Sequence, residues 1–204
     1  MNPPYDSVLF DFDGVLADTE PIHWACWVET LAPLGIELPW KTYCDNCIGV
    51  ADRHMIQFLA SLASAPASSD SLAPYYPRKK ALFRERILQA SPCAPATVEL
   101  IRSLTDYSLA VVTSSGRSEV EPVLVRAGIH PLLGAVVFGE DVEHVKPAPD
   151  AYLLAAARLG AKRPLVVEDS AAGVASARAA GFDVVRVDKP EEVATAVRAR
   201  LNFR

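Results

Sequence analysis

The sequence predicts an α/β fold in which a parallel, doubly wound sheet carries a helical insertion after its first strand. Three observations lead to this fold class. Short apolar segments recur along the chain, helix-like segments lie between the last four of them, and a glycine follows each of these helices. Strands and helices that alternate in this way are typical of parallel sheets, because parallel strands need crossover connections.

Five segments of apolar or β-branched residues have the length of buried strands. They are residues 8–10, 109–112, 135–138, 165–167 and 183–187. The helices expected between the last four strands are 119–127, 150–159 and 171–180, and each ends at a glycine, the usual C-terminal stop.

The long connection between the first two strands shows helical patterns and no convincing strand. We expect helices at 21–34, 52–63 and 77–89, with a Ser/Ala/Pro-rich loop at 64–74. The insertion as a whole spans about residues 18–92. Because it begins immediately after an acidic motif, we favour a lid over the strand ends rather than helices that only pad the core.

Composition limits the classes of function. The chain has 204 residues, half of them hydrophobic, and a formal net charge of −5. Basic residues form no long run, so we expect no nucleic-acid partner. We see no signal peptide and no apolar run long enough to cross a bilayer, so we expect a cytoplasmic protein with no membrane partner. A monomer is the default expectation.

Two of the four cysteines, Cys44 and Cys47, have C-x-x-C spacing. A structural zinc site would need a second pair of ligands, and the sequence offers none at a suitable spacing. We therefore favour ordinary thiols over a metal-binding or redox pair.

The most informative segment is Asp11-Phe12-Asp13-Gly14-Val15, directly after the first predicted strand. Alternate residues of an extended segment point the same way, so Asp11 and Asp13 can converge on one small volume. Two carboxylates this close repel each other unless a cation or a shared proton lies between them. The segment therefore suggests a hard metal ion at the carboxyl end of the sheet, where such folds bind ligands.

Polar residues also follow two further strands. Thr113 and Ser114 lead into a helix and can bind a phosphate, although such residues also cap helices routinely. Lys146 directly precedes two turn-forming prolines, Pro147 and Pro149, and is a second candidate to bind the phosphate; the alternative is a solvated surface lysine. Glu168 and Asp169 end the fourth strand. The two interpretations of these acids are a magnesium site, which we favour, and a simple helix cap. Together these clusters are more specific than any one of them.

In this order the motifs resemble the haloacid dehalogenase superfamily, specifically its phosphatase-like branch with a helical cap after the first motif. The resemblance covers nearly the whole chain. Asp11 to Val15 match the D-x-D-G-V/T signature, and Thr113, Lys146 and the Glu168-Asp169 pair match the other three motifs. The resemblance implies a Rossmann-like catalytic core of residues 1–17 and 93–204, and a helical cap domain of residues 18–92.

The resemblance also assigns chemical roles. Asp11 is the expected nucleophile, which forms an aspartyl-phosphate, and Asp13 is the expected general acid and base. Thr113, the Ser114 amide and Lys146 are expected to hold the transferring phosphoryl oxygens.

The implied cofactor is Mg²⁺. The expected ligands are the Asp11 carboxylate, the Asp13 backbone carbonyl and Asp169, while Glu168 either supports that group or ligates through water. Phosphoryl transfer depends chiefly on positioning and charge neutralisation, which agrees with this set.

The start of the insertion resembles the caps of sugar-phosphate phosphatases and β-phosphoglucomutases. Glu20, His23 and Arg53 are the substrate-facing candidates. The alternatives are a helix-face or core histidine for His23 and a surface salt bridge for Arg53. Trp24 and Trp27 are expected in the core of the cap.

The resemblance leads to a Mg²⁺-dependent phosphatase that acts on a small phosphorylated metabolite, such as a sugar phosphate. Asp13 favours phosphate esters over carbon–halogen bonds and phosphonates, because only an alkoxide leaving group needs its proton. The alternatives are a β-phosphoglucomutase-like mutase and a catalytically idle binding protein on the same fold. Phe83 is followed by Arg84, not by the lysine that the mutases carry after a cap aromatic, which disfavours the mutase.

Overall fold

The structure, a computed structural model, describes residues 4–48, 52–63, 69–90 and 93–201. The chain divides into two compact units. One unit consists of Met1–Asp18 and Ser91–Arg204, and the other of Thr19–Ala90. We refer to them as the sheet unit and the helical unit.

The sheet unit is built around five parallel strands. They are β1 (Ser7–Phe10), β2 (Ser108–Val112), β3 (Ala135–Val137), β4 (Pro164–Glu168) and β5 (Asp183–Arg186), in the spatial order β3-β2-β1-β4-β5. Each predicted strand is present within about one residue of its expected ends, a normal boundary error. The predicted α/β fold class with a parallel sheet is therefore confirmed.

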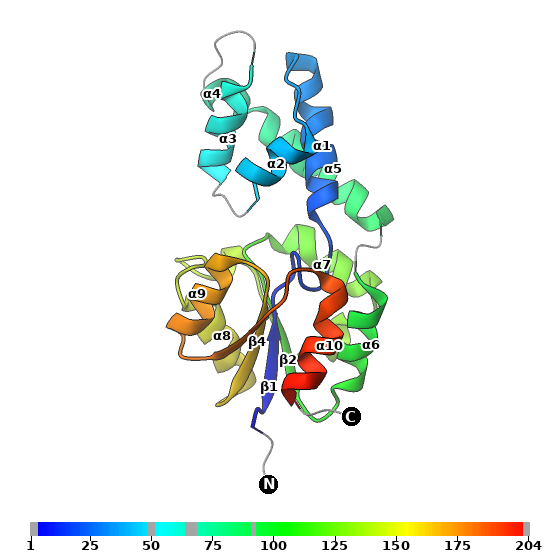
Figure 1. Cartoon of the computed structure of the whole chain (residues 1–204), viewed down its shortest axis with the longest axis vertical. Helices are drawn as coiled ribbons and strands as arrows, with labels where there is room; N and C mark the ends of the chain where they lie inside the picture. Colours follow the sequence, from blue (N-terminus) through cyan, green and yellow to red (C-terminus); the bar gives the residue numbers. More distant parts are fainter. Residues whose placement is uncertain (1–3, 49–51, 64–68, 91–92, 202–204) are drawn as a thin grey trace. The chain divides into compact units, whose positions relative to one another are not determined.

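Helices cover both faces of this sheet, which explains why the inner residues of its central strands are apolar. The helices α8 (Asp150–Leu159) and α9 (Ala171–Ala179) lie together on one face, and α6 (Pro95–Ser103) and α10 (Pro190–Leu201) on the other (Figure 1). Between the sheet and α8 lies a fully buried cluster that includes Leu9, Val112, Tyr152 and Val166. This cluster anchors the strands whose ends carry the acidic motifs.

The crossover helices begin and end close to the predicted positions. The helix α7 (Arg117–Arg126) follows β2, and three helices of the sheet unit are followed within two residues by a glycine of positive φ. These glycines have φ of 68°, 65° and 80° at Gly128, Gly160 and Gly181. Positive φ suits glycine because it has no Cβ to clash, so these are true C-terminal stops. The sequence analysis did not predict α6 and α10.

The described part of the helical unit contains helices and no strand. These are α1 (Glu20–Leu31), η1 (Ala32–Leu34), α2 (Trp40–Asn46), α3 (Asp52–Ser61), α4 (Ser69–Leu72) and α5 (Tyr75–Ala90). The three predicted helices are present as α1 with η1, α3 and α5. The helix α2 was not predicted, and the loop expected at 64–74 is wrong at 69–72, where α4 lies.

The helical unit has its own core. Trp27 is 1% exposed and packs with Leu31, Tyr43 and Leu59, in agreement with its expected place in a hydrophobic core. Trp24 lies against this cluster, and its indole N–H donates to the Leu38 carbonyl at 2.8 Å. Both tryptophans therefore serve packing.

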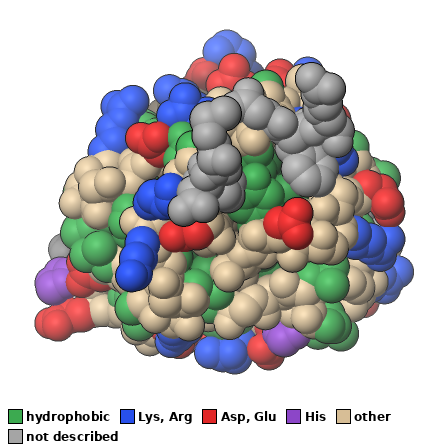
Figure 2. All heavy atoms as spheres, turned by 90° about the horizontal axis from the view of Figure 1, so that it is seen from below, with side chains coloured by type: hydrophobic (Ala, Val, Ile, Leu, Met, Phe, Trp, Pro, Cys, Tyr) green, Lys and Arg blue, Asp and Glu red, His purple; other side chains and the backbone are tan. Residues whose placement is uncertain are grey.

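No helix among the described residues is both long and apolar enough to cross a membrane. On the face of the molecule that Figure 2 shows, acidic and basic side chains are interspersed. Mixed charge of this kind agrees with the modest net charge of the chain.

Candidate functional site

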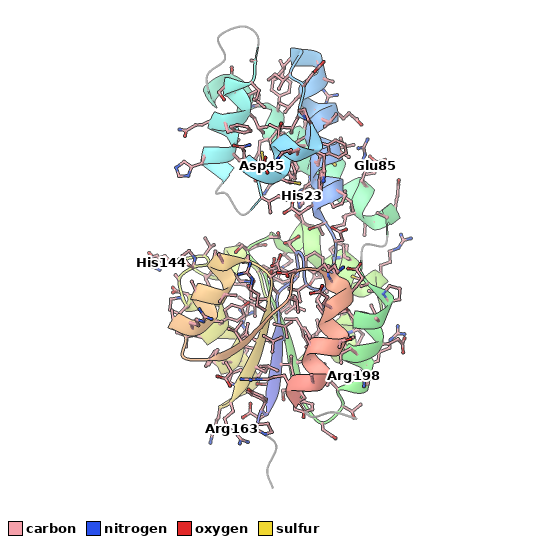
Figure 3. The ribbon with its side chains drawn as sticks, in the orientation of Figure 1. His23, Asp45, Glu85, His144, Arg163 and Arg198 are labelled. Atoms are coloured by element: carbon pink, nitrogen blue, oxygen red, sulfur yellow. The ribbon has the colours of Figure 1, made fainter. Side chains whose placement is uncertain are left out.

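The carboxyl ends of β1, β2 and β4 bring the predicted core residues together. Asp11 follows β1, Thr113 follows β2, and Glu168 and Asp169 end β4. The strand ladder continues into the motif, because the Asp11 amide donates to the Val167 carbonyl at 3.0 Å. The loop before α8 lies at the same end, and Figure 3 shows His144 of this loop there and Arg163, just before β4, at the opposite end.

Lys146 is the centre of a buried ion cluster. Its ammonium donates to Asp11 Oδ1 at 2.7 Å, to Glu168 Oε1 at 2.7 Å and to the Val112 carbonyl at 2.9 Å. The side chains are 6% exposed for Lys146, 9% for Asp11 and 0% for Glu168. An ammonium has three protons, so each of them already has an acceptor. A phosphoryl oxygen that binds Lys146 must therefore displace one of these acceptors.

Burial and charge set the protonation of this cluster. Burial by itself would lower the pKa of Lys146, but Asp11 and Glu168 outweigh it and raise that pKa above 10.5. Burial raises the pKa of Asp11 well above its usual value, with Lys146 opposing the shift and Glu168 and Asp13 adding to it. A further positive charge beside Asp11 would favour its ionised form, which is the form a nucleophile needs.

Three carboxylates at this end of the sheet could hold a metal ion. Among the described residues, Asp11, Glu168 and Asp169 each offer an oxygen, and these oxygens lie within 4.8 Å of one another. Burial, followed by the charge of Glu168, raises the pKa of Asp169 to about 6. Closely spaced carboxylates that ionise with difficulty fit a divalent cation such as Mg²⁺, because this cation prefers oxygen ligands and offsets their negative charge.

Gly14 keeps the first motif close to these acids. Its φ is 74°, and a Cβ at this position would lie 2.1 Å from Asp169 Oδ2. Any larger residue would therefore suffer both backbone strain and a clash with the carboxylate. Glycine here allows the chain after Asp13 to pass directly beside Asp169.

The side chain of Asp13 is not part of the three-carboxylate group. Its Oδ2 accepts a hydrogen bond from the Ser115 hydroxyl at 2.7 Å and a weaker one from Thr113 at 3.4 Å. The Thr113 hydroxyl in turn accepts from the Ser115 amide at 2.9 Å. Ser115 was not among the predicted site residues, although it belongs to the same polar segment. Ser114, its neighbour, is exposed.

Two further buried contacts around Lys146 were also not predicted. The Tyr152 hydroxyl donates to Glu168 Oε1 at 2.7 Å. The buried Ser176 hydroxyl donates to the Ala148 carbonyl at 2.6 Å and so ties the loop that follows Lys146 to α9. No sequence motif indicates either contact, because both depend on how the helices pack.

The helical unit brings two candidate residues into contact with partners of their own. Glu20, at the start of α1, accepts a hydrogen bond from the Tyr43 hydroxyl at 2.6 Å. His23, one turn later on α1, lies within hydrogen-bond distance of Lys79 on α5 and stacks on Phe83, with ring centroids 3.8 Å apart. An ammonium can only donate, so Nδ1 of His23 accepts.

Lys79 was not found by sequence reasoning. It is 5% exposed, and its ammonium lies 5.6 Å from the centre of the Trp27 ring and 5.1 Å from that of Phe83. Burial, together with the charges of Lys79 and Lys80, lowers the pKa of His23 well below its usual value. The helical unit thus holds a buried lysine one helical turn before Phe83, whereas the residue after Phe83 is Arg84.

Arg53 lies on α3, but its side chain is outside the described residues, as is most of the segment 49–54 that contains it. Cys44 and Cys47 are both free thiols, and burial raises the pKa of Cys47 to about 11. A thiol of high pKa is a poor nucleophile, which agrees with ordinary cysteines.

Comparison with known proteins places this geometry in a family. The model of the family described as "Haloacid dehalogenase-like hydrolase" matches residues 8–187. The chain is 32% identical over 190 residues to the fructose-1-phosphate phosphatase YqaB of Escherichia coli, which covers 92% of this chain and 98% of the relative. It is also 32% identical over 188 residues to a phosphorylated carbohydrates phosphatase of Thermotoga maritima, covering 87% and 82% of the two chains.

A solved structure supports the same assignment. A Thermotoga maritima protein described as a candidate β-phosphoglucomutase superposes with a TM-score of 0.73 at 25% identity, covering 95% of this chain and 99% of that one. The motifs at three strand ends, the parallel sheet and the family match over most of the chain all agree. The chain belongs to the haloacid dehalogenase-like hydrolase family.

Proposed function

We propose that this enzyme is a Mg²⁺-dependent phosphatase that hydrolyses a small phosphorylated metabolite, such as a sugar phosphate, through an aspartyl-phosphate intermediate. The observation that carries the proposal is the contact between Asp11, Lys146 and Glu168 beside Asp169. This contact supports the proposal because a carboxylate, a buried ammonium and a group of three carboxylates that could hold a metal ion lie close together. The two relatives above that are named as phosphatases of phosphorylated sugars support the substrate class.

Asp11 is the proposed nucleophile. Its carboxylate attacks phosphorus and forms the acyl phosphate, while the ester oxygen leaves with the electron pair of the broken bond. Lys146 holds Asp11 in place through the 2.7 Å hydrogen bond and offers a positive charge to the phosphoryl oxygens. Because all three ammonium protons are in use, an entering phosphoryl oxygen takes over one of the existing hydrogen bonds.

Asp13 is the proposed proton carrier. It gives a proton to the leaving oxygen and then takes one from the water that hydrolyses the aspartyl-phosphate. The Ser115 hydroxyl holds the Asp13 carboxylate through the 2.7 Å hydrogen bond, which limits its rotation. Thr113 and the Ser114 amide are the proposed contacts to the remaining phosphoryl oxygens, at the N-terminal side of α7.

The proposed cofactor is held by Asp11, the Asp13 backbone carbonyl and Asp169, with Glu168 beside them. When bound, Mg²⁺ supplies positive charge that neutralises the phosphoryl group and its developing transition-state charge. The helical unit is the proposed cap, which excludes water and selects the leaving group, with Glu20, His23 and Arg53 as candidate contacts to the substrate.

A β-phosphoglucomutase-like transfer is the second candidate. Two observations favour it: the similarity to the candidate β-phosphoglucomutase, and the buried Lys79 beside His23 in the helical unit. In a mutase the phosphorylated sugar would turn around and react again, instead of water attacking the intermediate.

A screen of phosphorylated metabolites with Mg²⁺ tests the proposal, with phosphate release as the readout. We expect turnover of at least one sugar phosphate by the wild type, none by Asp11→Asn, and normal turnover by the control Asp106→Asn, which changes an exposed aspartate. Wild-type protein that releases phosphate from no member of the panel would reject the phosphatase. Isomer production from glucose 1-phosphate, without net phosphate release, would favour the mutase.

A further inference from the structure

The hydroxyl of Tyr152 occupies an unusual place for a core residue. Tyr152 lies in the first turn of α8, is 0% exposed, and its ring packs in the main cluster of the sheet unit. A phenylalanine would fill the same space without a polar group to bury. Burying a hydroxyl costs free energy unless it is hydrogen-bonded, and here the bond is made to a carboxylate of the candidate site.

This carboxylate, Glu168, is held by five hydrogen bonds. Its Oε1 accepts from the Tyr152 hydroxyl and from Lys146, both at 2.7 Å. Its Oε2 accepts from the Asp169 amide at 3.1 Å, the Ser170 amide at 3.2 Å and the Ser170 hydroxyl at 3.1 Å. Glu168 cannot turn without losing several of these bonds, so it serves as a rigid support.

Tyr152 also contacts Lys146 directly. The ammonium lies 4.9 Å from the centre of the Tyr152 ring, within the range of a cation–π interaction. The same ammonium is shared between Glu168 Oε1 and Asp11 Oδ1 at equal distances of 2.7 Å. Tyr152 thus interacts with Lys146 in two ways. Its ring lies beside the ammonium, and its hydroxyl binds the same oxygen, Glu168 Oε1, that accepts a hydrogen bond from Lys146.

The shared oxygen determines how strongly Glu168 attracts the lysine. A hydrogen bond from Tyr152 takes up part of the negative charge of Oε1, which weakens the pull of Glu168 on the ammonium. Without the hydroxyl, that charge acts on Lys146 alone and draws it toward Glu168 and away from Asp11. The positive charge of Lys146 would then lie away from the position where phosphoryl transfer needs it.

We propose that Tyr152 is a positioning residue that keeps Lys146 poised between Glu168 and Asp11. The proposal rests on the proposed function, in which Lys146 stabilises the transferring phosphoryl group. It concerns the hydroxyl and not the ring, since the ring has a packing role that any aromatic residue of similar size would fulfil.

Tyr152→Phe tests the proposal because it removes only the hydroxyl. Tyr5→Phe is the matched control: Tyr5 is also buried, and its hydroxyl also donates to a carboxylate at 2.7 Å, that of Asp183 at the start of β5. That contact lies at the amino ends of the strands, away from the candidate site. Three quantities are measured for each variant: kcat and KM for a substrate found in the screen, the Kd for vanadate with Mg²⁺ by calorimetry, and the melting temperature.

We expect Tyr152→Phe to lower kcat about tenfold with little change in KM, because a hydrogen bond to a charged group contributes on that scale. The Kd for vanadate, which imitates the transition state, should rise by a similar factor. Tyr5→Phe should leave both quantities unchanged, even if its melting temperature falls. Both quantities are measured well below the melting temperature of each variant, where nearly all of the protein is folded, so a changed Kd reports positioning and not a loss of folded protein.

Two results would overturn the proposal. One is a Tyr152→Phe variant whose kcat and vanadate Kd both match the wild type. The other is lost activity with an unchanged vanadate Kd, which would assign the hydroxyl to stability alone. A wild type that binds vanadate but turns over no ester would count against the proposed phosphatase, and the Kd ratio would still decide the role of Tyr152.

Discussion

Removing the positive charge of Lys146 should destabilise the folded enzyme at neutral pH. In Lys146→Met the side chain keeps its approximate length, but Asp11 and Glu168 are left as neighbouring buried carboxylates without their shared cation. Breaking a buried ion pair by removing one partner typically costs about 3–5 kcal/mol, because the other charge stays buried and unpaired. We expect a loss of this size in the free energy of unfolding at pH 7.

The loss should shrink as the pH falls. The pKa of Asp11 is already raised by burial, and without Lys146 it rises further, so the folded variant takes up a proton more readily than the folded wild type. Of the folded and unfolded states, the one that binds more protons gains stability as the pH is lowered. The difference between variant and wild type should therefore be smaller at pH 5 than at pH 7.

Urea unfolding in the presence of a chelator, at both pH values, measures these differences. Lys189→Met is the control, because Lys189 is 62% exposed and lies 3.9 Å from Glu192, so its loss should change the free energy of unfolding by less than about 0.5 kcal/mol. A Lys146→Met variant that loses less than about 1 kcal/mol at pH 7 would refute the account of the buried cluster, since that is the scale of a surface pair. A loss that is identical at both pH values would also refute it.

Three further predictions concern the proposed metal site. Gly14→Ala should weaken Mg²⁺ binding measured by calorimetry, because its Cβ would lie 2.1 Å from Asp169 Oδ2. The control is Gly35→Ala, which has a similar φ of 67° and no atom within 4 Å, so it should bear only the backbone strain. Equal Mg²⁺ affinity in the two variants would contradict this prediction. Mg²⁺ affinity should also fall as the pH is lowered through about 6, since the raised pKa of Asp169 means that this carboxyl takes up a proton there and a protonated carboxyl is a poor ligand. By the same shift, the metal-free wild type should lose stability relative to metal-free Asp169→Asn as the pH rises from 4 through 6, because folded Asp169 binds the extra proton in that range. Affinity that does not change between pH 5 and pH 7, or the same pH dependence in Asp169→Asn, would contradict the assignment.

The sheet could be predicted because its signals are local. Apolar runs of strand length and the glycines after the crossover helices are visible in any short window of the sequence. The helix α10 carried a usable signal that we did not exploit: Pro190 at its start, two acidic residues in its first turn, and Arg198 and Arg200 in its last. The helix α2 has only seven residues, too few for a clear periodic pattern.

The sequence motifs indicated candidate site residues but not the contacts between them. The motifs pointed to Asp11, Lys146, Glu168 and Asp169, and the structure brings these side chains together. The motifs could not show that Glu168 shares one oxygen between Lys146 and Tyr152, since this depends on how α8 packs on the sheet.

The same limit explains the missed residues of the helical unit. His23 and Lys79 are 56 positions apart in the sequence, and only the pairing of α1 with α5 brings them together. An isolated lysine in a helical pattern is normally a surface residue, so no local signal distinguishes Lys79 from its neighbour Lys80.

The central claim is that Asp11 forms a covalent bond to phosphorus. The most direct measurement is to quench the enzyme during turnover with acid, reduce any acyl phosphate with borohydride, and locate the reduced residue by mass spectrometry of peptides. The account predicts that Asp11 is reduced. With an aryl phosphate as substrate, whose leaving group needs little protonation, more of it should be reduced in an Asp13→Asn variant, in which the intermediate is hydrolysed slowly. Substrate turnover with Asp11 unmodified in both proteins, or with another residue reduced, would contradict it.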